Sequence, residues 1–133
     1  MMDEGTLKEI ERRRVEESRL YENYIKYYEK RDFVKAGEFL WGCINNLAYA
    51  LGLVYRKKLS SHREVVRFLK ELAKREGKDK YRKYTSSAED LHANFYHGWM
   101  DEEEFEEKVK EVEELRRWLI ELLEKSLSLQ KLA

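Results

Sequence analysis

The feature that most constrains this chain is the spacing of its apolar residues, which recur at intervals of three and four. None of the 133 residues is proline, and the sequence has neither Asn-Gly nor Asp-Gly hairpin signals nor long alternating apolar and polar runs. Residues at such intervals share one face of an α-helix, which turns about every 3.6 residues. The spacing therefore predicts an all-α fold.

Capping residues indicate where the helices begin. Asp32 is a predicted N-cap, while Ser61 with Glu64 and Asp101 with Glu104 have the spacing of capping boxes. The glycines placed to end a helix are Gly77 and Gly98. The predicted helices cover about 7–31, 33–58, 61–77, 79–97 and 101–127, with a candidate break at 85–87.

Five amphipathic helices joined by short turns predict a five-helix up-and-down antiparallel bundle. The length is that of one domain, so we expect a single domain over 1–133 with an ordered core at about 7–128. The helix over 33–58 is the most apolar, and we expect it at the centre of the bundle.

Charge is balanced overall but uneven along the chain. The 27 Lys and Arg match the 27 Asp and Glu, which argues against a protein that binds polyanions over its whole surface. Residues 74–83 hold six positive and two negative side chains, and residues 101–114 hold two positive and nine negative. These segments are either solvated helix faces, a basic site for phosphates, or complementary patches that orient a dimer.

The composition also indicates a location. Cys43 is the single cysteine, so one chain has no internal disulfide and no zinc site built from cysteines. The longest apolar stretch, 48–55, is too short to span a bilayer, and no leader pattern precedes it. We expect a cytoplasmic protein without membrane contact. Its many Glu, Lys and Arg and its single Gln resemble thermophile proteins.

The segment "LHANFYHGWM", residues 91–100, concentrates the residues with chemical potential. His92 and His97 are five positions apart and point about 140° from each other on a helix, so they do not chelate one ion. We expect no metal and no other cofactor. Imidazole suits proton transfer near neutral pH, and two copies of the chain facing each other in a dimer would bring these histidines together.

A family resemblance centres on the same segment. "DFVKAGEFLWGCINNLAYAL" (32–51), "SH" (61–62) and "LHANFY" (91–96) resemble the archaeal PaREP family within the HEPN superfamily of helical bundles. The likeness extends from about Tyr21 to Leu123. It implies an HEPN-like fold, a homodimer with a groove between its protomers, and a small nucleotidyltransferase as a partner. Active HEPN ribonucleases cleave RNA without metal, using an Arg and a His that precede the last long helix.

This chain departs from that motif. His97-Gly98-Trp99 resembles the family's His-Gly-Tyr, but His92 takes the place of the Arg, and a neutral imidazole does not replace a guanidinium. Arg56 and His62 also have the motif's spacing, which chance explains in so charged a chain. We expect His62 to be exposed beside its cap.

The sequence leaves three functions open. The first is a non-catalytic homodimeric module that binds RNA, a nucleotide or a protein partner; the second is a metal-independent endoribonuclease; the third is a structural oligomerisation protein. The candidate catalytic residues are His97 and His92, and the candidate binding residues are Asn94, Tyr96, Trp99, Lys80, Arg82 and Lys83. The structural alternatives are a hydrogen-bonded His92, a helix-capping His97, and packing roles for the aromatic residues.

Overall fold

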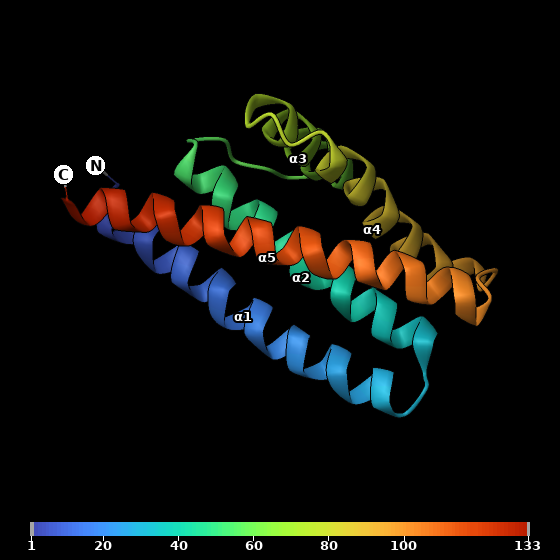
Figure 1. The fold of residues 1–133 in the computed structure, drawn as a ribbon. Helices are drawn as coiled ribbons and strands as arrows, with labels where there is room; N and C mark the ends of the chain where they lie inside the picture. Colours follow the sequence, from blue (N-terminus) through green and yellow to red (C-terminus); the bar gives the residue numbers. More distant parts are fainter. Residues whose placement is uncertain (1, 133) are drawn as a thin grey trace.

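The structure, a computed structural model, describes residues 2–132, which form five helices without any strand (Figure 1). The helices are α1 (Glu4–Glu29), α2 (Phe33–Val54), α3 (His62–Arg75), α4 (Lys80–His97) and α5 (Glu102–Leu132). The predicted all-α class and the number of helices are confirmed.

Helix α2 lies at the centre of the molecule and contacts each of the other four helices. Figure 1 shows α1, α2 and α5 side by side along the length of the molecule, with α3 and α4 forming a further pair. A Cβ atom at Gly37 of α2 would lie 3.3 Å from the Phe105 ring of α5 and 3.4 Å from Leu91 of α4. The missing side chain therefore lets both helices approach α2 closely.

Two of the helices end earlier than the apolar pattern predicts. Helix α1 ends at Glu29 rather than at residue 31, because Arg31 has φ 61° and is left-handed. Helix α2 ends at Val54 rather than at residue 58, because Arg56 has φ 59° and the next N–H donates to the carbonyl of Gly52 at 2.7 Å. At the other end of the chain, α5 continues past the predicted end at residue 127.

Helix α4 runs without a break through residues 85–87. The hydroxyl of Thr85 donates to the carbonyl of Tyr81 at 2.8 Å, and that of Ser87 donates to a carboxylate oxygen of Glu111 at 2.7 Å. Both hydroxyls thus find acceptors while the helix continues, Thr85 on the carbonyl one turn earlier and Ser87 on α5. The candidate break predicted there is absent.

The long side chains between α1 and α5 form a polar seam. Arg116 donates to both carboxylate oxygens of the buried Glu17, Tyr21 donates to Glu113 at 2.9 Å, and Tyr28 donates to Glu106.

None of the helices described combines the length and the apolar character that crossing a membrane requires.

Candidate functional site

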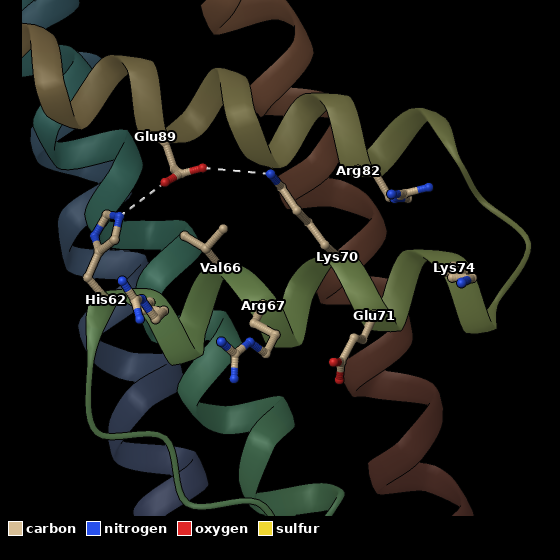
Figure 2. Close-up of a pocket in the computed structure, with 9 residues that line it drawn as sticks. His62, Val66, Arg67, Lys70, Glu71, Lys74, Arg82 and Glu89 are labelled. Carbon is tan, nitrogen blue, oxygen red and sulfur yellow. Dashed lines mark hydrogen bonds and ion pairs between the residues drawn. The ribbon is translucent and has the colours of Figure 1, made fainter.

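A groove of about 560 Å³ lies between α3 and the first half of α4. Figure 2 shows Lys70 of α3 reaching toward Glu89 of α4, while Arg82 approaches from α4. The volume is in the range typical of ligand sites, and the groove is open to solvent.

Cationic side chains dominate this groove. Its lining includes five of them against two carboxylates, and the cations are Arg63, Arg67, Lys70, Lys74 and Arg82. Glu89 pairs with Lys70 at 4.0 Å, and Glu71 pairs with Lys57 at 3.8 Å. Within the part of the chain that the structure describes, no carboxylate lies within ion-pair distance of Arg63, Arg67 or Lys74. We call these three the unpaired cations.

The cations share a surface because of their spacing on α3. The α3 members lie at positions 63, 67, 70 and 74, which repeat at four and three residues and so fall on one side of the helix. The opposite side buries Val65, Leu69 and Leu72 in the core. Burial of the apolar side therefore orients the basic side toward solvent and α4.

The three basic residues predicted on α4 do not act together. Arg82 lines the groove, whereas Lys80 lies 2.7 Å from Glu114 and Lys83 lies 3.6 Å from Glu111 of α5. The hydrogen bond with Glu114 raises the pKa of Lys80 above its ordinary value. Lys80 and Lys83 of the basic segment 74–83 thus pair with the acidic segment 101–114 of the same chain.

Two histidines and a tryptophan meet beside the groove. The rings of His62 and His92 lie 5.4 Å apart, centroid to centroid, at an interplanar angle of 27°. Trp41 of α2 lies 5.0 Å from the first ring and 5.2 Å from the second. Because His62 also lines the groove, this cluster continues the cationic surface.

Each of these histidines has a carboxylate of its own. His92 Nδ1 lies 2.8 Å from one oxygen of Glu38, and His62 Nε2 lies 3.3 Å from one oxygen of Glu89. A carboxylate that binds one imidazole nitrogen orients the ring and leaves the other nitrogen for proton transfer. Chemically, the cluster has the parts of an acid–base pair next to a groove lined by cationic side chains.

The remaining predicted residues lie further along α4. His97 is the last residue of α4, and its side chain is exposed. Among the described residues, no ring contact joins it to His92. Asn94 is buried, and its side-chain oxygen accepts the Met100 N–H at 2.9 Å, which fixes the turn into α5. Tyr96 and Trp99 are exposed.

Sequence reasoning missed the residues on α3. It took His62 as an exposed residue beside its cap and did not single out Arg63 or Arg67, although the spacing of four and three residues was readable. Lys74 entered only as part of the basic segment 74–83. The pairing of His62 with His92 had no signal in the sequence, because it depends on how α3 and α4 dock.

No group of three or more His, Cys, Asp or Glu side chains suited to a metal ion occurs in the described part of the chain.

The model of the archaeal PaREP1/PaREP8 family matches residues 12–116. This match covers most of the 133 residues and includes the groove and the histidine cluster, so the chain belongs to that family. No curated protein and no solved structure matches this chain.

Proposed function

We propose that this PaREP1/PaREP8 family member is a non-catalytic RNA-binding module that holds the sugar–phosphate backbone in the α3–α4 groove. The observation that carries the proposal is the set of unpaired cations, Arg63, Arg67 and Lys74. Cations already paired with carboxylates gain little from a phosphate, because the new contact replaces an existing one. These three have no such competitor within the described residues.

A polynucleotide suits this surface better than a single phosphate does. The unpaired cations lie at positions 63 to 74 of α3, and the eleven steps between the first and the last correspond to about 16 Å of helix. A chain with a phosphate at every residue can contact them together and release a counterion at each contact. Because the net charge is zero, such binding depends on a local cationic patch, and this groove provides one.

The proposal includes an HEPN-like bundle with antiparallel helix pairs that forms a homodimer. Support for antiparallel packing of α1 against α5 comes from their seam, where Glu17 meets Arg116, Tyr21 meets Glu113 and Tyr28 meets Glu106. A strict up-and-down order of five helices would make the first and the fifth parallel, so this seam argues against a simple alternation. The proposed groove lies within one chain and does not require a partner copy. Light scattering on the purified protein tests the homodimer separately from RNA binding.

The test of RNA binding compares charge variants at constant salt. We expect Arg67→Ala and Lys74→Ala to weaken binding of a labelled RNA to a similar degree for different sequences, because phosphate contacts carry no sequence information. Arg12→Ala is the matched control, since Arg12 is exposed on α1 and pairs with Glu9 there. Equal affinities of the parent and both groove variants would refute the proposal.

A second candidate function, RNA cleavage without metal, is favoured by the His62–His92 pair. One imidazole would take the proton of a ribose 2′-hydroxyl, whose oxygen attacks the phosphorus, while the other protonates the departing 5′-oxygen. The products are a 2′,3′-cyclic phosphate and a 5′-hydroxyl end. Incubation with RNA in EDTA should then give cleavage in the parent and in His97→Ala, but none in His62→Ala or His92→Ala.

A further inference from the structure

One side of α4 changes from cationic to aromatic along its length. Arg82, Glu89 and Tyr96 are spaced by seven residues, so they lie on nearly the same side of the helix. The first two line the groove, and Tyr96 lies beyond it, about 21 Å along the axis from Arg82. A ligand that leaves the groove along α4 therefore meets aromatic side chains next.

A row of ring contacts connects the two regions. His62 lines the groove, its ring lies 5.4 Å from His92, the His92 ring lies 5.3 Å from Tyr96, and Tyr96 lies 5.2 Å from Phe95. Tyr96 is 67% exposed, Trp99 49% and Phe95 39%. We call Phe95, Tyr96 and Trp99 the aromatic patch.

Most other aromatic residues of the chain are at least half-buried in the core or against it. Trp41, for example, stacks on His92, lies tilted against His62, and is only 6% exposed. The aromatic patch is different, because all three of its rings lie among the exposed large apolar side chains of the described residues. Its exposed side chains are therefore accessible to a flat ligand group.

We propose that the aromatic patch stacks nucleobases of the same RNA strand whose phosphates lie in the α3–α4 groove, so that the ligand is single-stranded. This inference rests on the proposed function and specifies the form of its ligand. In a duplex the base faces are covered by their neighbours, and only unpaired bases can stack on protein rings. Cations for the backbone, followed by exposed rings, are the combination that single-strand binding uses.

The test separates base stacking from charge by using two strands of equal length. One probe is a labelled oligo(A) RNA, and the other is an abasic strand with the same phosphates but no bases. We expect Tyr96→Ala and Trp99→Ala to weaken binding of oligo(A) by roughly 5- to 100-fold and to leave binding of the abasic strand unchanged. Tyr96→Phe keeps the ring and should bind as the parent does.

A control variant removes exposed apolar surface at a site away from the aromatic patch. Val15 is 62% exposed on α1, so Val15→Ala should bind both strands normally. Stacking should also quench the fluorescence of the exposed Trp99, and the quenching should disappear in Trp99→Phe. Equal parental affinity for both strands, or for oligo(A) and its duplex with oligo(U), would overturn the stacking proposal. If Arg67→Ala still weakened binding, the proposed function would survive that result, whereas no binding to any strand would overturn both.

Discussion

Removing the buried ion pair between Glu17 and Arg116 is the strongest test of how the bundle is stabilised. The side chains of Glu17 and Arg116 are only 5% and 15% exposed, and the guanidinium also lies 3.5 Å from the centre of the Tyr21 ring. Burial acts to lower the pKa of Arg116, but its hydrogen bonds and attraction to Glu17 together act more strongly, so the pKa is raised. Removing Glu17 would leave this charge without a partner inside the protein.

We therefore expect Glu17→Ala to lower the free energy of unfolding by about 3–5 kcal/mol, the usual cost of removing one member of a buried ion pair. Replacing both members, as in Glu17→Leu with Arg116→Met, should restore most of that stability, because no unpaired charge remains. Urea unfolding followed by circular dichroism at several protein concentrations measures both effects. A double-mutant cycle then isolates the coupling between the two residues.

The neighbouring pair on the same helix supplies the control. Glu16 and Arg19 also form hydrogen bonds, but their side chains are 37% and 59% exposed. Water and salt screen such a pair, so Glu16→Ala should change stability little or not at all. The reasoning is refuted if Glu17→Ala costs no more than Glu16→Ala, or if the double variant is less stable than Glu17→Ala alone.

Three further predictions concern local structure. Burial raises the pKa of the Cys43 thiol, so above pH 8.5 the unfolded chain holds fewer protons than the folded one. The free energy of unfolding should therefore fall by up to about 1.4 kcal/mol between pH 8.5 and 9.5. Unfolding titrations over this range measure the loss, which Cys43→Ala should lack. A Cβ at Gly52 would lie 2.8 Å from the Lys57 carbonyl oxygen, so Gly52→Ala should cost about 1–3 kcal/mol in urea unfolding, and an unchanged midpoint would contradict this. Asn94→Ala leaves the Met100 N–H without its acceptor and should cost about 1–3 kcal/mol, whereas Asn94→Asp keeps the acceptor and should unfold closer to the parent.

Local sequence signals predicted the elements of the fold well. The capping residues Asp32 and Ser61 begin helices as expected, and Gly98 ends α4 with φ 58°. The ends of α1 and α2 were placed too late because Arg31 and Arg56 adopt a left-handed conformation that residues of this type rarely take. Propensity and spacing do not reveal such a conformation, which is set by how the next helix packs.

The candidate site depended more on tertiary structure. Arg82 and Lys83 are adjacent in the sequence, yet one faces α3 and the other pairs with Glu111 of α5. Likewise, His92 pairs with His62, thirty positions away, rather than with the nearby His97. Which side of α4 meets which helix decides both outcomes, and the amphipathic pattern of a single helix does not contain that information.

The salt dependence of RNA binding tests the central claim most directly. If single-stranded RNA lies in the groove, the slope of log Ka against log salt should be between about −2, for the three unpaired cations, and about −3.5, for all five groove cations. The combined variant Arg63→Ala, Arg67→Ala, Lys74→Ala should flatten that slope by about 2. A parental slope near zero, or an unchanged slope in the combined variant, would contradict the account.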